Sequence, residues 1–218
     1  MSAKTEHEMT LEPCPSQVQA QLLLGQTHVD KGFMTEAFTY FEAAARSGHP
    51  TALNMLGRAY ERGWGVARDA RQAASYFEHA AAAGENWAMF NLADLFLLGD
   101  GVPQDKAKAY QMYVSSAKRG NAKALNMLGI LHEEGITGAV DLEGAEVFFK
   151  AAAEGGDYWA VLNLARLALA NEKPEEANAL LEKALSSGHD DIRQAILELV
   201  KPHGKNPAFR WVYHAASL

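Results

Sequence analysis

The chain has 218 residues, of which 48% are hydrophobic and 22% are charged, with only 7 prolines. This composition can bury a core, and it excludes a disordered or collagen-like chain. The net charge of -7 divides into -4 for residues 1–109 (9 basic, 13 acidic) and -3 for residues 110–218 (11 basic, 14 acidic). Neither half has the basic excess that nucleic-acid binding requires.

Residues 1–17 are expected to form a mobile leader. The start, MSAKTEHEMT, has no basic residues followed by an apolar run, and no segment approaches about 18 consecutive apolar residues. We therefore expect neither a signal peptide nor a membrane span, and a cytoplasmic protein. Cys14 is the only cysteine and lies between two prolines, so we expect an inert thiol and neither an intramolecular disulfide nor a cysteine zinc cluster.

The next segment is an internal repeat. ALNMLG occurs at 52–57 and again at 124–129, with AMFNLA at 88–93 and AVLNLA at 160–165, so the period is 36 residues. Glycines and aspartates downstream of this motif recur with the same 36-residue spacing. One further unit at each end matches its neighbour at a spacing of 32 residues, four fewer than the period. Five repeats therefore run from about 20 to 191.

Each repeat is predicted to form two helices joined by a turn. In the second repeat, Ala52, Leu56 and Tyr60 recur every fourth residue on one helix face. Gly63 is expected to end that helix in a left-handed cap, and Asp69 to begin the next helix. In the fifth repeat, Pro174 stands at a first helical position. Such hairpins cannot bury their apolar faces alone, so neighbours must stack into a superhelix with a concave side.

The segment ALNMLGRAYERGWGVARD at 52–69 resembles the Sel-one-like repeat, a relative of the tetratricopeptide repeat. The fourth unit departs from the pattern with GITGAVD, and the outer two are nearer to plain tetratricopeptide units. The resemblance implies an all-α, right-handed α-α superhelix (solenoid) of about five helical hairpins over residues 18–200, with a capping helix near 191–200 and about eleven helices. It also implies a non-enzymatic scaffold or adaptor, without cofactor, that binds a protein or peptide in its concave groove.

The same resemblance assigns the groove to the first helix of each repeat. Asparagine occurs in this helix in each of repeats two to five, and its amide can donate to and accept from a peptide backbone. Arg58, Lys123 and Arg166 would take the role of the basic residues that hold a peptide carboxylate in tetratricopeptide clamps. The candidate binding positions, repeat by repeat, are Thr51, Asn54 and Arg58; Trp87, Asn91 and Asp94; Lys123, Asn126 and Ile130; and Trp159, Asn163 and Arg166.

Structural alternatives exist for these positions. The asparagines either grip a partner or satisfy the backbone of a neighbouring helix. Trp87 and Trp159, 72 residues apart, either anchor a partner or cover the edge of their own hairpins. For Trp64 we expect packing over the helix turn rather than ligand binding.

Catalysis finds little support in the sequence. His28 and His132 occupy the register of Tyr60, and His132-Glu133-Glu134 lacks a second His one turn away, so we expect no catalytic or metal site. One alternative function is a toxin-neutralising immunity or inhibitor protein. A weaker alternative is a hydrolase acting on cell-wall-like ligands. The family members associated with such ligands have paired cysteines, which this chain lacks. The sequence predicts no particular oligomeric state.

The tail, residues 201–218, belongs to no repeat. It carries three large aromatic residues and three basic residues on an acidic protein. Exposed together, the aromatics would form an apolar patch that monomers rarely display. Either the tail folds back on the last helices as a cap, or it lies in the concave groove. The residues concerned are Phe209, Trp211, Tyr213, Lys201, Lys205 and Arg210.

Overall fold

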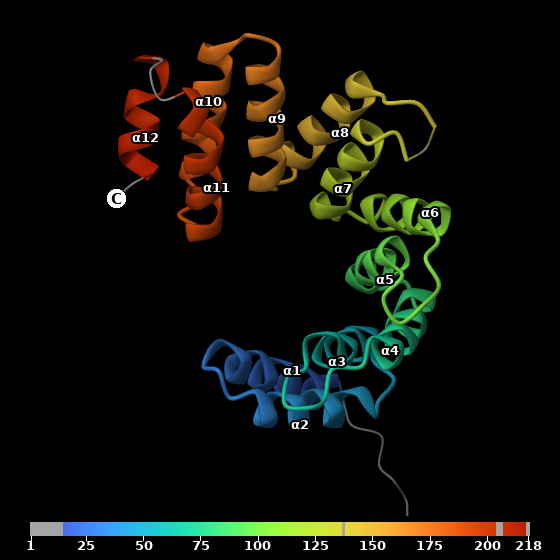
Figure 1. The fold of residues 1–218 in the computed structure, drawn as a ribbon. Helices are drawn as coiled ribbons and strands as arrows, with labels where there is room; N and C mark the ends of the chain where they lie inside the picture. The colour runs from blue at the N-terminus through green and yellow to red at the C-terminus, as the bar shows by residue number, and fades with distance from the viewer. Residues whose placement is uncertain (1–14, 137, 204–206, 217–218) are drawn as a thin grey trace, which may run out of the picture. The chain divides into compact units, whose positions relative to one another are not determined.

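The computed structural model describes residues 15–136, 138–203 and 207–216, and every regular element within them is helical (Figure 1). The all-α solenoid of helical hairpins predicted from the sequence is confirmed. The packed hairpins are α1 with α2, α3 with α4, α7 with α8, and α9 with α10, and the third repeat supplies α5 and α6. Their bounds are α1 (Pro15–Asp30), α2 (Met34–Ala45), α3 (Pro50–Arg62), α4 (Ala70–Ala82), α5 (Asn86–Leu98), α6 (Lys106–Ala117), α7 (Ala122–Glu133), α8 (Leu142–Glu154), α9 (Tyr158–Ala170) and α10 (Pro174–Leu185).

After the hairpins come the predicted capping helix α11 (Asp190–Val200), two short 3-10 turns (Lys201–His203 and Pro207–Phe209) and α12 (Arg210–Ala216). The described residues thus hold twelve α-helices against the eleven expected, because part of the tail is itself helical. None of the helices in the described part of the chain is long and apolar enough to cross a membrane.

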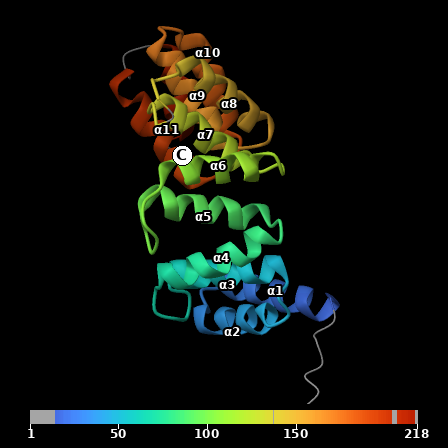
Figure 2. The same cartoon turned by 90° about the vertical axis from the view of Figure 1, so that its right-hand side faces the viewer.

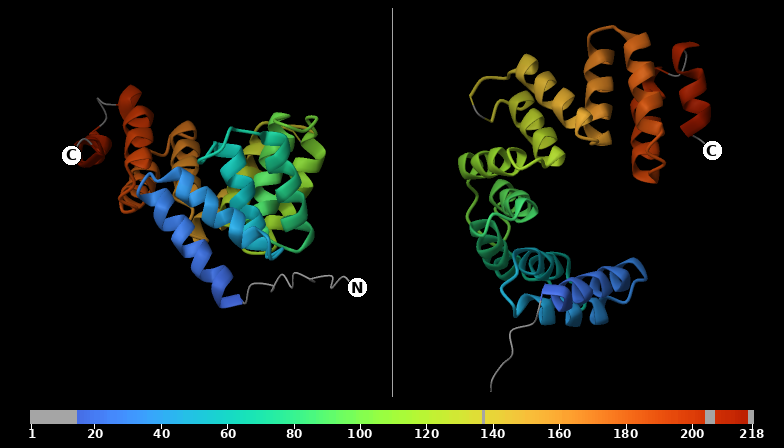
Figure 3. Two further views of the ribbon diagram at one scale, coloured as in Figure 1. Left: turned by 90° about the horizontal axis from the view of Figure 1, so that it is seen from below. Right: turned by 180° about the vertical axis from the view of Figure 1, so that it is seen from behind.

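The chain divides into two compact units, Met1–Gln104 and Asp105–Leu218. The boundary falls in the loop between α5 and α6, inside the third repeat. In the first unit α1 packs on α2, α2 on α3, α3 on α4 and α4 on α5 (Figure 2). In the second unit the same order of packing runs from α6 to α11 (Figure 3). Each helix therefore contacts mainly its neighbours in sequence, as a solenoid requires.

The turn residues act as predicted. Gly63 ends α3 in the left-handed region with φ of 72°, which a glycine adopts without steric cost. The Asp69 side chain caps α4 by accepting from the backbone N–H groups of Arg71 and Gln72, each at 3.0 Å. Asp105 and Asp141, at the same register position, cap α6 and α8 in the same way.

The hairpin core depends on a small residue in the first helix facing a large one in the second. A Cβ atom on Gly57 would lie 2.6 Å from the ring of Phe77, so the ring can pack only against glycine. The pairs Gly25 with Phe41 and Gly129 with Phe149 repeat this close approach. In the fifth hairpin, alanine at the same position is buried in one cluster with a leucine, Ala165 with Leu181.

The described part of the tail packs on the end of the second unit. Phe209 is 1% exposed, and with Val212 and Ala216 it joins the buried cluster formed by α9, α10 and α11. This is the arrangement that the cap alternative expects. Residues 1–14 with Cys14, Lys205, and the side chains of Arg210, Trp211 and Tyr213 lie outside the described residues.

Candidate protein-binding surface

Each unit carries one first-helix surface, formed by α3 and α5 in the first unit and by α7 and α9 in the second. The repeated motif begins at an alanine in four repeats, and these register alanines are Ala52, Ala88, Ala124 and Ala160. The residue before each register alanine lies in the first turn of its helix and has an exposed side chain: Thr51, Trp87, Lys123 and Trp159. Trp87 is 43% exposed and Trp159 is 40% exposed. Both indoles are therefore half open to solvent, as the anchor alternative requires.

Acidic side chains cap the two helices that carry these tryptophans. Asp157 is buried and accepts from the backbone N–H of Ala160 at 3.0 Å, which fixes the start of α9. Glu85 caps α5 by accepting from the backbone N–H of Ala88. Burial raises the pKa of Glu85, although its backbone hydrogen bonds oppose the shift.

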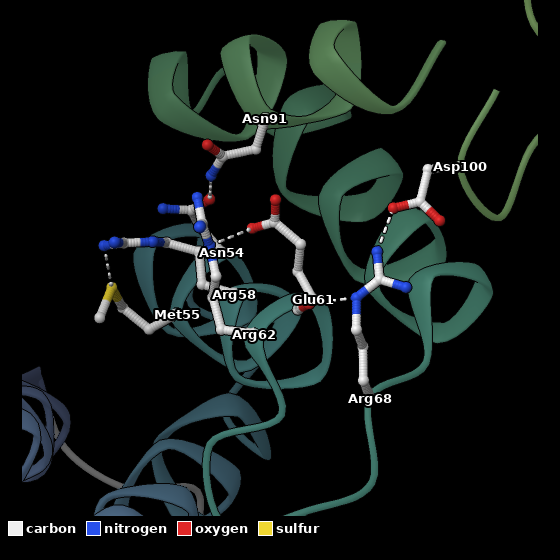
Figure 4. Close-up of polar contacts among 8 residues, drawn as sticks. All are labelled: Asn54, Met55, Arg58, Glu61, Arg62, Arg68, Asn91 and Asp100. Carbon is white, nitrogen blue, oxygen red and sulfur yellow. Dashed lines mark hydrogen bonds and ion pairs between the residues drawn. The ribbon is translucent and has the colours of Figure 1, made fainter. Parts of the chain in front are cut away.

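The four asparagines form two amide pairs. The Nδ2 of Asn91 donates to the Oδ1 of Asn54 at 2.9 Å (Figure 4), and the Nδ2 of Asn163 donates to the Oδ1 of Asn126 at the same distance. Asn54 and Asn126 are buried, with 3% and 8% exposed. The pairs join α3 to α5 and α7 to α9, so these amides link neighbouring first helices. The sequence left open that each asparagine bonds to the backbone of a neighbouring helix. In the structure it does bond to a neighbouring helix, but to an asparagine side chain rather than to the backbone.

Arg58 and Arg166, which share a register position, have different partners. The Arg58 guanidinium carbon lies 5.1 Å from the centre of the Trp64 ring. The Nη1 atom of Arg58 lies 3.9 Å from the Met55 sulfur (Figure 4). Burial lowers the pKa of Arg58, with the nearby Glu61 carboxylate opposing the shift. Arg166 makes a two-pronged ion pair with Glu133, at 2.7 and 2.5 Å. Both arginines are therefore engaged within their own units.

The remaining candidates lie on the same surfaces. Lys123 is exposed in the first turn of α7, Asp94 is half-buried on α5, and Ile130 is half-buried on α7. In the second unit the surface thus combines an exposed lysine with the exposed Trp159.

Two family models match the chain. The Sel1 repeat model matches residues 18–49, 50–85 and 88–121, and the tetratricopeptide repeat model matches residues 137–198. The chain belongs to the Sel1-like and tetratricopeptide-like repeat superfamily. The fifth unit is thus tetratricopeptide-like as expected, whereas the expectation that the first unit is nearer to a plain tetratricopeptide repeat is wrong, because residues 18–49 match a Sel1 repeat.

Solved structures show the same Sel1-like fold. A Sel1 repeat protein from Oxalobacter formigenes superimposes with a TM-score of 0.76 at 22% identity, covering 92% of this chain and 85% of that chain. Two immunity proteins from Pseudomonas aeruginosa superimpose with TM-scores of 0.64 and 0.61, at 20% and 18% identity. They cover 94% and 95% of this chain and 78% and 84% of their own lengths. No curated protein matches the sequence.

Two polar networks of this Sel1-like protein were not predicted. In the first unit, Arg68 pairs with Asp100 and donates from Nε to the backbone oxygen of Glu61 at 3.0 Å (Figure 4). In the second, Nδ1 of His132 donates to the Asp141 carboxylate at 3.0 Å, and Nε2 of the same ring hydrogen-bonds to the Tyr110 hydroxyl at 3.1 Å. The His132 ring also packs on the Phe148 ring. His132 therefore has a packing role at the repeat position that Tyr60 occupies in the second repeat.

The described residues give no sign of a metal centre. No group of three or more His, Cys, Asp or Glu side chains among them could hold a metal ion. Glu133 of the sequence HEE pairs with Arg166, and His132 binds Asp141 and Tyr110. These residues therefore have structural partners.

Proposed function

We propose that this protein is a non-enzymatic scaffold that binds a peptide or protein partner on its first-helix surfaces, in the cytoplasm. The observation that carries the proposal is the matched exposure of Trp87 and Trp159 at the starts of α5 and α9. Large aromatic side chains that are partly exposed on rigid helices are the residues most often found to dominate protein interfaces. Superfamily membership supports the proposal, because these repeats generally serve as protein-interaction scaffolds.

The amide pairs have a supporting part in this proposal. By linking α3 to α5 and α7 to α9, they hold neighbouring first helices at a fixed separation. A surface that is rigid before binding loses less entropy when a partner docks. The proposal therefore assigns direct contact to Trp87, Trp159 and Lys123, and positioning to the four asparagines.

The test is an affinity pull-down from the source organism's lysate, followed by titration of the purified partner. Changing both Trp87 and Trp159 to alanine should weaken binding by about 2 kcal/mol or more, or roughly 30-fold, if they are anchors. The matched control is Val147→Ala, which truncates an exposed apolar side chain on the second helix α8. Equal affinity of the double variant and the control would contradict the proposal.

A toxin-neutralising immunity or inhibitor protein is a second candidate. It is favoured by the two Pseudomonas aeruginosa immunity proteins among the structures with this fold, and at 18–20% identity that likeness extends to the fold alone. Such a protein would bind its toxin with a dissociation constant of about 1 nM or below, equivalent to about -12 kcal/mol. One-to-one loss of the partner's activity on complex formation would favour this candidate over a plain scaffold.

A further inference from the structure

The second unit contains a cavity of about 180 Å³ between α8, α9 and α10. Its apolar wall is formed by Leu164, Leu167 and Ala168 of α9 and by Leu180 of α10. The loop between α9 and α10 is four residues shorter than the corresponding loop of the second repeat, and Asn171 and Lys173 from this loop line the cavity. The cavity therefore lies where the fifth repeat packs on α8 of the fourth repeat.

The position of Ala168 holds an aromatic ring in each of the other four repeats. In register with it stand His28, Tyr60, Phe96 and His132. In the second repeat the ring of Tyr60 stacks on Tyr76 with centres 5.6 Å apart, and meets Phe38 edge-on at the same distance. Three rings thus fill the space between consecutive helices of the first unit.

The fourth repeat has the same arrangement of rings. His132 lies between Tyr110 and Phe148, with ring centres 5.9 and 4.9 Å away. Around the fifth repeat the three equivalent residues are Glu146 of α8, Ala168 of α9 and Leu180 of α10, and all of them line the cavity. The cavity is therefore the space that the missing central ring fills elsewhere.

The cavity has the size of one aromatic ring. An aliphatic cavity of about 150 Å³ in another protein is large enough to take up benzene. A volume of about 180 Å³ accommodates a single ring with a small substituent. Filling it would recover dispersion contacts that its leucine walls lack when the space is vacant.

Charged side chains surround the apolar wall. Glu146 pairs with Lys150 at 2.6 Å, and Lys173 pairs with Glu176 at 3.3 Å. The hydrogen bond between Glu146 and Lys150 lowers the pKa of Glu146 and raises the pKa of Lys150. The charge of Lys173 adds to the shift of Glu146, and the charge of Glu176 adds to the shift of Lys150. All four charges thus act on one another around the cavity. A hydroxyl group that reached them could donate to a carboxylate and accept from an ammonium group.

We propose that this cavity binds a phenol ring, with the ring against Leu164, Leu167 and Leu180 and the hydroxyl toward the two ion pairs. The ligand occupies the place that the other repeats fill with a ring of their own. The phenol is carried either by a tyrosine side chain or by a small free molecule. This site goes beyond the proposed scaffold function and does not depend on Trp87 or Trp159.

The test uses the full chain and p-cresol, with binding followed by the NMR shifts of the leucine methyl groups. We expect saturable shifts at Leu164, Leu167 and Leu180 in the wild type, and at least a tenfold loss of affinity in Ala168→Phe, which puts back the missing ring. Leu180→Phe is the second variant, because other repeats carry a ring at that position too, and it should reduce affinity similarly. Absence of methyl shifts in the wild type, or unchanged affinity in a folded filling variant, overturns the proposal.

Further probes separate the chemistry and the source of the ring. Toluene lacks the hydroxyl and should bind at least fivefold more weakly than p-cresol, and equal binding overturns the assignment of a phenol. N-acetyl-tyrosine amide that binds as well as p-cresol supports a tyrosine side chain as the natural ligand. Binding of this amide that is tenfold weaker supports a small free phenol.

Discussion

At the scale of single residues, the amide pairs change what the asparagines are expected to do. Replacing Asn91 by alanine leaves the buried Oδ1 of Asn54 without its donor, which costs about 1–3 kcal/mol of unfolding free energy. We therefore expect Asn91→Ala and Asn163→Ala to lower stability as well as any partner affinity. The measurement is denaturant unfolding of both variants.

A double-mutant cycle distinguishes pairing from separate roles. Asn54→Ala should lower the free energy of unfolding by less in a chain that already carries Asn91→Ala, because the two side chains share one hydrogen bond. The cycle Asn126 with Asn163 is the matched control in the second unit. Simple addition of the single effects would mean that the amides do not depend on each other.

Asp141 provides a residue-scale prediction about pH. Its hydrogen bond from the Gly144 backbone N–H, followed by that from His132, lowers the pKa of this carboxyl below its ordinary value. A lowered folded-state pKa means stabilisation that is present above the unfolded value of about 3.9 and is lost as pH falls through the folded value. Asp141→Asn keeps a good helix cap and removes the charge. The stability advantage of the wild type over this variant should shrink below about pH 4, in unfolding experiments from pH 3 to 7.

At the scale of helices, the hairpins depend on the match between Gly57 and Phe77. Gly57→Ala places a methyl group 2.6 Å from that ring and should destabilise by about 1–3 kcal/mol through overpacking. Adding Phe77→Leu should recover part of the loss, because the fifth hairpin already combines Ala165 with Leu181. The melting temperatures of the single and double variants provide the measurement. A double variant less stable than Gly57→Ala would refute this account.

The helices were the part of the molecule most accessible to sequence reasoning. The 36-residue register and residues such as Gly63 and Asp69 are local signals, because each acts on backbone groups within a few positions. The Arg166–Glu133 pair was missed because it joins residues 33 apart on different helices. The asparagine pairing was missed because sequence does not tell an amide that faces a ligand from one that faces the next helix.

At the scale of the whole molecule, the solenoid predicts that damage stays local. Phe209→Ala removes a ring that is 1% exposed and should cost about 3–5 kcal/mol. Because each repeat contacts mainly its neighbours, hydrogen exchange should accelerate in α10, α11 and α12 while α1, α2 and α3 keep their protection. Equal acceleration at both ends would indicate one cooperative unit instead.

The two amide pairs also set the length by which such a chain can grow. In each pair the acceptor asparagine lies two residues after the register alanine of its repeat, and the donor asparagine lies three residues after the register alanine of the next repeat. The acceptor and donor positions therefore alternate from repeat to repeat. A duplicated segment of 72 residues brings both members of a pair and adds a complete rung. A duplicated segment of 36 residues brings only one member and sets two helices of the same kind side by side. The natural module of this protein is therefore the double hairpin, and engineered versions should be lengthened or shortened in steps of two repeats.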